Sequence, residues 1–104
     1  MTTTHTSALA RKALQYLRRH CTIHDITLTD STIWELEYHE IIDEEWETRG
    51  PDGPYMRERT YEVGSTDYGN TLEELLDALA RINDDDNLTY MHVHLPAQMA
   101  GQLQ

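Results

Sequence analysis

The chain has 104 residues and carries 19 acidic against 8 basic residues, which gives a formal net charge of −11 at pH 7. This length accommodates one small domain and excludes two independent cores. The negative charge favours basic surfaces as partners and argues against direct nucleic-acid binding, because phosphate would be repelled. The charge is also uneven, since residues 1–24 contain four basic residues and no acid.

The single cysteine, Cys21, excludes an intramolecular disulfide and is compatible with a reducing compartment. The first residues lack the basic region and apolar run of a secretory signal peptide. No apolar stretch approaches the roughly 20 residues that a membrane-spanning helix needs. We therefore expect a soluble, cytoplasmic protein without a membrane partner.

Residues 1–6 are polar and predict a disordered extension. Ser7 is a suitable N-cap for a helix that reaches about His20. The apolar positions of this helix share one face because they recur at spacings of three and four: Leu9, Ala10, Ala13, Leu14 and Leu17. Residues 22–31 then predict a connector, with a short extended piece at residues 26–28.

Residues 32–47 combine two conflicting patterns. As a strand, the segment alternates apolar and acidic residues and contains β-branched and aromatic side chains. As a helix, Thr32 and Glu35 would form a capping box and the many glutamates would suit the conformation, but no single apolar face emerges. The alternation of apolar and acidic residues, with a period of two residues, fits the segment better than a helical pattern. A strand is therefore favoured over a helix.

Residues 49–54 contain two glycines and two prolines and predict a turn. Residues 55–63 alternate again, so the runs on either side of this turn predict an antiparallel hairpin. In such a hairpin, Arg57 and Arg59 would lie opposite carboxylates of the first strand.

Residues 64–70 are small and polar and predict a loop. Thr71 and Glu74 match a capping box for the following helix, with Asn70 as an alternative cap. The apolar residues of this helix form one stripe: Leu72, Leu75, Leu76, Leu79 and Ile82.

Residues 88–95 alternate along a last strand, which Pro96 ends, and residues 97–104 predict a polar tail. The expected order is α-β-β-α-β, in one domain that spans residues 7–96. Both helices would pack on one face of a three-stranded, mainly antiparallel sheet, which gives an α+β fold with a helical crossover to the last strand. The other face of the sheet would stay open to a partner.

Carboxylates are concentrated in the first strand of the hairpin. Seven acids fall within thirteen residues: Glu35, Glu37, Glu40, Asp43, Glu44, Glu45 and Glu47. On a strand, same-face neighbours lie about 7 Å apart, close to the spacing of successive phosphates along one nucleic-acid strand. Such an array can compete with nucleic acid for a basic protein surface, although a soluble, highly charged hairpin without a specific partner also explains the composition.

Four aromatic residues, Trp34, Trp46, Tyr55 and Tyr61, are candidate apolar anchors for the same partner. A stacking platform for single-stranded nucleic acid is excluded, because such platforms need basic surroundings. The carboxylates would steer association, and the aromatic residues would supply contact area.

Other chemistry receives little support from the sequence. The run 84–86 is acidic but lacks the alternating spacing of a calcium loop. His92 and His94 share a strand face, as zinc ligands do, and His39 or Asp43 could add ligands, but nothing in the sequence places them nearby. We expect no metal, no cofactor and no catalytic residues, and therefore no enzyme.

The acidic stretch 34–47, the short length and the compact α/β pattern resemble the small acidic inhibitors of phages and mobile elements, including DNA mimics and anti-CRISPR proteins. The resemblance lies in size and charge and involves no motif. It implies a stoichiometric inhibitor that occupies a basic, nucleic-acid-binding surface of a partner complex. A homo-oligomeric interaction module, such as a homodimer, and a histidine-carboxylate metal protein are the alternatives.

Overall fold

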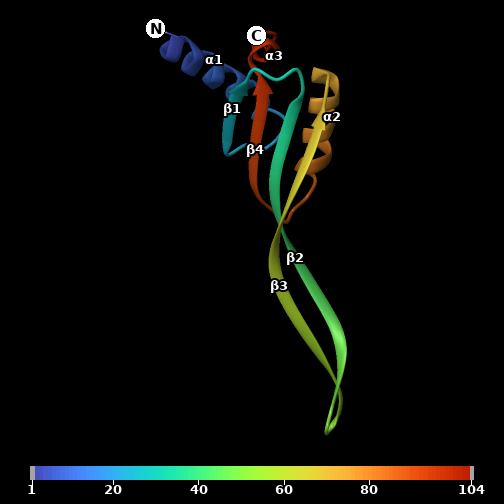
Figure 1. Cartoon of the computed structure of the whole chain (residues 1–104). Helices are drawn as coiled ribbons and strands as arrows, with labels where there is room; N and C mark the ends of the chain where they lie inside the picture. The colour runs from blue at the N-terminus through green and yellow to red at the C-terminus, as the bar shows by residue number, and fades with distance from the viewer. Residues whose placement is uncertain (1, 104) are drawn as a thin grey trace.

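The computed structural model describes the backbone of residues 2–103 and the side chains of residues 8–103. The elements in chain order are α1 (Thr2–Leu17), β1 (Asp25–Thr29), β2 (Trp34–Gly50), β3 (Gly53–Gly69), α2 (Leu72–Asn83), β4 (Leu88–Pro96) and α3 (Ala97–Ala100). Figure 1 shows that the helices gather around one end of the sheet, which we call the head, and that β2 and β3 extend far beyond it.

The four strands form one mixed sheet in the order β1-β4-β2-β3. β4 pairs in parallel with β1 and antiparallel with β2, and β2 pairs antiparallel with β3. The α+β prediction is confirmed, but the predicted three-stranded sheet is wrong by one strand. The additional strand is β1, which contains the short extended piece expected at residues 26–28 within a connector. Asp25 of β1 lies opposite His92 of β4, and no local sequence pattern signals such a distant parallel pairing.

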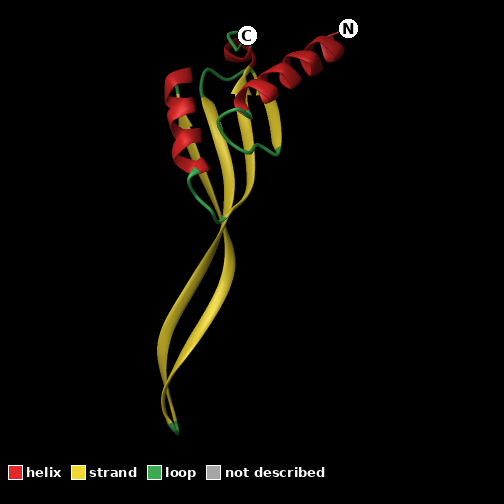
Figure 2. Ribbon diagram, turned by 180° about the vertical axis from the view of Figure 1, so that it is seen from behind, coloured by secondary structure: helices red, strands yellow, loops and turns green. Residues whose placement is uncertain are grey.

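The long helices α1 and α2 cover the same face of the sheet (Figure 2), as predicted. The sheet contributes these buried side chains to the core: Trp34, Leu36, Met91, Val93 and Leu95. Because side chains alternate along a strand, the opposite face carries polar residues. This open face, which no described helix covers, includes Thr27, Glu35, Glu37, His39, Tyr90, His92 and His94.

Helix α2 begins at the predicted capping residue. The backbone N–H of Glu74 donates to the Thr71 hydroxyl oxygen at 3.2 Å, and the hydroxyl donates to the Glu74 carboxylate at 2.9 Å. Three residues of the predicted stripe are buried, together with Ala78: Leu75, Leu79 and Ile82. The other two, Leu72 and Leu76, are partly buried against the core. A local cap and a regular apolar face are therefore sufficient to predict this element.

Helix α1 is longer at its start than the sequence predicted. It runs from Thr2 to Leu17, so it includes residues 2–6, where a disordered extension was expected, and it ends before His20. Ala13 and Leu17 reach the core from its predicted apolar face. Within the described part of the chain, no helix combines the length and apolarity needed to cross a bilayer.

The C-terminal segment is not the polar tail that was predicted. α3 follows β4 directly, and Met99, Ala100 and Leu103 are buried in the core. A helix of four residues is too short to show a periodic apolar face, so its burial depends on neighbouring elements.

The segment 32–47 is a strand from residue 34 onward, which confirms the prediction of a strand and not a helix. β2 and β3 pair along their whole length without a register shift and close at Gly50 and Gly53. Only Pro51 and Asp52 remain in the turn between the strands. Gly53 has a φ of 115°, a backbone conformation that residues with a side chain rarely adopt. The glycine- and proline-rich turn was correctly predicted and is shorter than expected.

β3 continues to Gly69, although residues 64–70 were predicted as a loop. Small polar residues are tolerated there because β3 is an edge strand. Gly69 lies against Trp34, whose indole N–H donates to the Thr71 carbonyl oxygen at 2.8 Å. A Cβ atom at Gly69 would lie 2.5 Å from a ring carbon of Trp34. Close approach of the indole therefore requires glycine at this position.

We expect Gly69→Ala to destabilise the protein by about 1–3 kcal/mol, because the buried indole has to shift. Gly64→Ala on the same strand is the matched control, since its Cβ would lie 3.4 Å from the nearest atoms of the His39 ring. The control should be neutral or slightly stabilising, because alanine reduces the freedom of the unfolded chain. Urea denaturation of both variants checks the prediction, and equal free energies of unfolding would contradict it.

β4 accompanies β2 only as far as Glu40. Beyond that point, residues 41–62 form a two-stranded ribbon with no further strand of the described chain beside it, and we call this ribbon the β-arm (Figure 1). The β-arm gives the molecule principal extents of 69 × 26 × 22 Å. Two-stranded ribbons twist strongly, and the β-arm coils visibly along its length.

Candidate functional site

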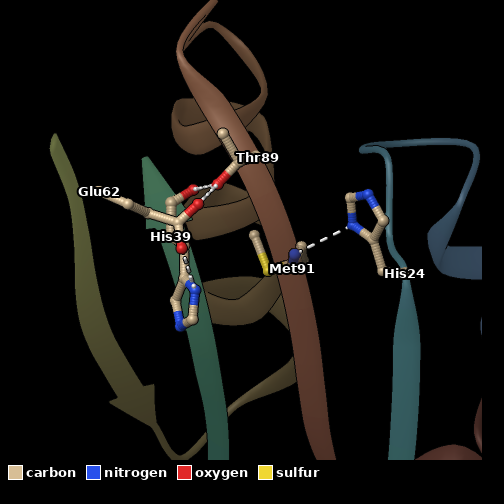
Figure 3. Close-up of polar contacts among 5 residues, drawn as sticks. All are labelled: His24, His39, Glu62, Thr89 and Met91. Carbon is tan, nitrogen blue, oxygen red and sulfur yellow. Dashed lines mark hydrogen bonds and ion pairs between the residues drawn. The ribbon is translucent and has the colours of Figure 1, made fainter. Parts of the chain in front are cut away.

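Three side chains hold the β-arm where it leaves the head. Thr89 lies at the register shift between β2 and β4. Its hydroxyl oxygen lies 2.9 Å from Glu62 Oε2 and 3.2 Å from the His39 carbonyl oxygen. The other carboxylate oxygen of Glu62 lies 3.2 Å from His39 Nδ1 (Figure 3). Glu62 of β3 thus connects all three strands at the base of the β-arm.

One face of the β-arm is mainly acidic, with Arg49 as its basic residue near the turn. We call its four exposed carboxylates the acidic face: Asp43, Glu45, Glu47 and Glu58. Glu45 and Glu58 are direct cross-strand partners, and like charges in that position destabilise a hairpin. Among the described side chains, no lysine or arginine forms an ion pair with any of the four. The acidic face therefore presents its charge to solvent at a cost to the fold.

The opposite face of the β-arm is aromatic. We call the following side chains the aromatic face: Ile42, Glu44, Trp46, Tyr55, Arg57, Arg59 and Tyr61. Trp46 is 41% exposed and Tyr55 is 48% exposed. The Arg59 guanidinium lies 4.7 Å from the ring centroid of Tyr61 and 6.0 Å from that of Trp46. This face therefore presents large rings that stay partly exposed, although Arg59 lies over two of them.

The fold neutralises Glu44. Arg59 Nε donates to Glu44 Oε2 at 2.8 Å, and the Tyr61 hydroxyl donates to Glu44 Oε1 at 2.6 Å. These hydrogen bonds, together with the charge of Arg59, lower the pKa of Glu44. The bond to Glu44 raises the pKa of the Tyr61 hydroxyl. Glu44 therefore stays ionised and links the two strands of the β-arm.

The other predicted acids lie outside the β-arm. Glu35 and Glu37 lie on the open face of the head, and Glu40 lies beside Asp85. The hydrogen bond between the two carboxyl groups raises the pKa of Glu40 and lowers that of Asp85. Asp85 also accepts a hydrogen bond from the Asn87 backbone N–H at 2.9 Å. The seven acids that are continuous in sequence are therefore divided among separate surfaces.

The structure separates the four predicted aromatic anchors. Trp46, Tyr55 and Tyr61 lie together on the aromatic face. Trp34 is only 2% exposed and belongs to the core, so its side chain is not available to a partner. Alternation along the strand placed Trp34 and Trp46 on the same side, but only the tertiary structure shows that helices cover one and not the other.

The cations of α1 and of the turn that follows it do not neutralise the acids through contact. No described ion pair involves a basic residue of this helix or of this turn. Arg18 Nε donates to the Ile23 carbonyl oxygen at 3.0 Å, and the Arg19 guanidinium lies 5.5 Å from the Tyr16 ring centroid. The positive charge of the first helix and the negative charge of the β-arm therefore lie at opposite ends of the molecule (Figure 1).

The open face gathers imidazole rings around Tyr90. The centroid of the Tyr90 ring lies 5.4 Å from that of His24, 5.3 Å from that of His39 and 6.3 Å from that of His92. His94 stacks on His92 with a centroid distance of 4.1 Å. His24 Nδ1 also accepts a hydrogen bond from the β4 backbone at 3.1 Å (Figure 3). This cluster is a second concentration of ionisable side chains, remote from the tip of the β-arm.

In the sequence, His39 and Asp43 are the candidates for further ligands beside His92 and His94. The structure brings Glu37 to the pair instead, because Glu37 lies opposite His92 across β2 and β4. Asp43 lies on the β-arm, and His39 contacts Glu62. The two-residue spacing of the histidines was a visible signal, but the partner depends on strand register.

No protein-family model matches this chain, and neither a curated protein nor a solved structure matches it. The geometry of the β-arm and of the open face is therefore the guide to function.

Proposed function

We propose that the β-arm binds a basic protein surface and that the protein is a non-enzymatic, stoichiometric inhibitor of a nucleic-acid-binding complex. The observation that carries this proposal is the acidic face, whose four carboxylates lie on a projecting ribbon without cationic partners in the described chain. A basic groove would supply those partners. The rows of carboxylates, about 7 Å apart, suit a surface built for successive phosphates.

The low intrinsic stability of the β-arm supports a role in binding. An isolated two-stranded ribbon is marginally stable in water, and the facing Glu45 and Glu58 weaken it further. A ribbon that projects from the fold at this cost gains stability when a partner neutralises its charge. The acidic face would steer association, while Trp46 and Tyr55 on the aromatic face would become buried anchors.

Charge reversal tests the proposal. The partner is first recovered from a host lysate at low salt, identified by mass spectrometry and purified. The variant carries Asp43→Lys, Glu45→Lys and Glu47→Lys, and we expect its affinity for the partner to fall at least about 100-fold. Each reversal replaces an attraction of about 1 kcal/mol with a repulsion. Wild-type affinity should fall steeply with added salt, and the protein should displace labelled nucleic acid from the partner.

The matched control changes the same charge elsewhere on the surface. Glu73→Lys, Asp84→Lys and Asp86→Lys alter three exposed acids on or next to α2, and this variant should bind within a few-fold of wild type. Circular dichroism confirms that both variants are folded. If the folded β-arm variant binds as tightly as the control, the proposal is overturned.

Self-association is a second candidate function, favoured by the exposed apolar side chains of the β-arm. Met56 is 63% exposed on the same side of the β-arm as Glu47, and Trp46 and Tyr55 are nearly half exposed on the opposite side. The edges of both strands are also unpaired beyond Glu40 within the described chain, and such edges can pair with another chain. Light scattering over a range of protein and salt concentrations distinguishes the two functions. A tight dimer that persists in high salt and dissociates in Trp46→Glu supports self-association.

A further inference from the structure

Three side chains from the two central strands converge on the open face. Glu37 comes from β2, and His92 and His94 come from β4. One ligand-capable atom from each lies within 4.8 Å of the other two, and all three residues are half-buried. We propose that these three residues bind a divalent transition-metal ion, with Zn²⁺ as the best-matched ion. This site lies on the head and is independent of the function proposed for the β-arm.

The sheet places the three side chains with little freedom. His92 and His94 are two residues apart, so both point to the same face of β4. Glu37 lies directly opposite His92 in the antiparallel pairing and diagonal to His94. β2 and β4 are the inner strands of the sheet, with a neighbour on each side. Ligands on such strands are held more firmly than ligands on loops.

The distances fit the coordination of zinc. His94 Nε2 lies 3.3 Å from Glu37 Oε1. In a tetrahedral site with bonds of about 2.0–2.1 Å, ligand atoms lie about 3.4 Å apart. The His92 and His94 rings stack at 4.1 Å with an interplanar angle of 19°. The ligand atom of His92 lies within 4.8 Å of the other two, so a rotation of its stacked ring is required to complete the site.

The donor atoms select the class of ion. Two imidazole nitrogens and one carboxylate oxygen suit Zn²⁺ and its neighbours in the transition series. Ca²⁺ and Mg²⁺ prefer sites built from oxygen alone. Three protein ligands also leave one position of a tetrahedral ion open to water or to a small ligand.

Surrounding hydroxyl groups orient the His92 ring. The Thr27 hydroxyl of β1 lies 2.8 Å from His92 Nε2, and the Tyr90 hydroxyl lies 3.3 Å from His92 Nδ1. A histidine that binds a metal ion generally has a hydrogen-bond partner on its other ring nitrogen. His92 can therefore bind the ion through Nδ1 while Nε2 keeps its shorter hydrogen bond to Thr27.

A hollow of about 140 Å³ adjoins the site. Its lining includes His94 and Glu35, which lies opposite His94 on β2, together with Thr29, Ser31 and Ile33. The hydroxyl oxygen of Thr29 is buried and has no hydrogen-bond partner among the described residues. The hollow thus provides space beside one proposed ligand, and the Thr29 hydroxyl offers a hydrogen-bonding group within it.

Metal titration of the full-length chain without a histidine tag tests the site. The protein is first stripped with a chelator, and Zn²⁺ binding is then measured by isothermal titration calorimetry. We expect one ion per chain and a higher Tm in the presence of Zn²⁺, because the ion binds the folded state. Co²⁺ should give the visible absorption bands of a tetrahedral complex. In NMR spectra, Zn²⁺ should shift the ring resonances of His92 and His94 and leave that of His39 in place.

Variants assign the ligands. Glu37→Gln and His94→Gln should each weaken Zn²⁺ binding by more than about 100-fold. Thr27→Val should weaken it by about 10–100-fold, the usual effect of losing a partner of a metal ligand. His39→Gln is the matched control, a histidine of the same face outside the cluster, and should bind Zn²⁺ as tightly as wild type.

Absence of stoichiometric Zn²⁺ binding in the wild-type protein would overturn the proposal. It would also fail if His39→Gln weakened binding as much as His94→Gln did. The NMR experiment uses only wild-type protein, so it decides the question even if a variant does not fold. Because neither measurement involves the β-arm, failure of the metal site leaves the proposed binding function unaffected.

Discussion

Replacing residues 43–60 with an Asn-Gly turn is expected to abolish partner binding and to leave the head folded. No described side chain of residues 41–62 belongs to the hydrophobic core or packs against it as a partly buried residue. The remaining hairpin keeps its contacts with β4 and the Glu62 link to Thr89. We expect Tm to change by no more than about 4 °C, which for a domain of this size corresponds to about 1 kcal/mol.

The site of the deletion follows from the register of the hairpin. The natural turn is closed by Gly50 and Gly53. Ile42 and Tyr61 also lie directly opposite each other, and an even number of residues along each strand separates them from the closing pair. Because hydrogen-bonded and non-hydrogen-bonded pairs alternate in an antiparallel ladder, the two pairs are of the same type. A two-residue Asn-Gly turn is suited to close such a pair.

Circular dichroism, thermal unfolding and binding to the purified partner check the deletion. A folded deletion variant that still binds the partner would place the interface on the head and contradict the proposed role of the β-arm. A variant that does not fold would show that the β-arm contributes to the stability of the head, contrary to the contacts observed. Under the self-association alternative, the same deletion would convert a dimer into a monomer without affecting the head.

Truncation of one side chain near the C-terminus is expected to have the largest effect on stability. Leu103 is only 3% exposed and belongs to the core. We expect Leu103→Ala to lower the free energy of unfolding by about 2–4 kcal/mol, because it leaves a cavity between elements that pack together. For a small domain this is a large share of a total stability of about 5–15 kcal/mol.

Gln102→Ala is the matched control, since Gln102 is the exposed neighbour of Leu103. Its effect should stay within about 0.5 kcal/mol, as for most surface substitutions. Urea denaturation of the two variants measures the difference. Equal stability would indicate that the C-terminal segment does not belong to the core, as the original prediction of a polar tail implied.

The two ends of the molecule serve different purposes in this interpretation. The head contains the core and holds the base of the β-arm through Glu62, His39 and Thr89. The β-arm contributes exposed charge and exposed rings without contributing to that core. This division explains how an acidic hairpin that is unfavourable by itself can be maintained in a small protein.

Local patterns were sufficient for the elements whose signals are local. The capping pair Thr71 and Glu74 predicted the start of α2, and a regular stripe of leucines predicted its buried face. The glycines and prolines of the turn, with alternating residues on both sides, predicted the β2–β3 hairpin. Such signals are readable because capping, helical periodicity and strand alternation involve residues close together in the chain.

Other features depended on contacts between distant residues. β1 becomes a strand because it pairs in parallel with β4, and Leu103 is buried because other elements cover it. The same applies to candidate ligands, since register alone brings Glu37 to the two histidines. The continuous run of acids gave no indication that Glu44 would be neutralised by Arg59 and Tyr61 while Glu45 would remain exposed.

Charge and periodicity are local properties, so the order of residues is enough to predict an acidic α+β protein with a helix at α2 and an acidic hairpin. Tertiary packing is needed to establish that the hairpin extends beyond the sheet as a β-arm, which strands pair, and which carboxylates have a partner. These outcomes depend on the free energy of packing distant segments together, and no window of neighbouring residues contains that information.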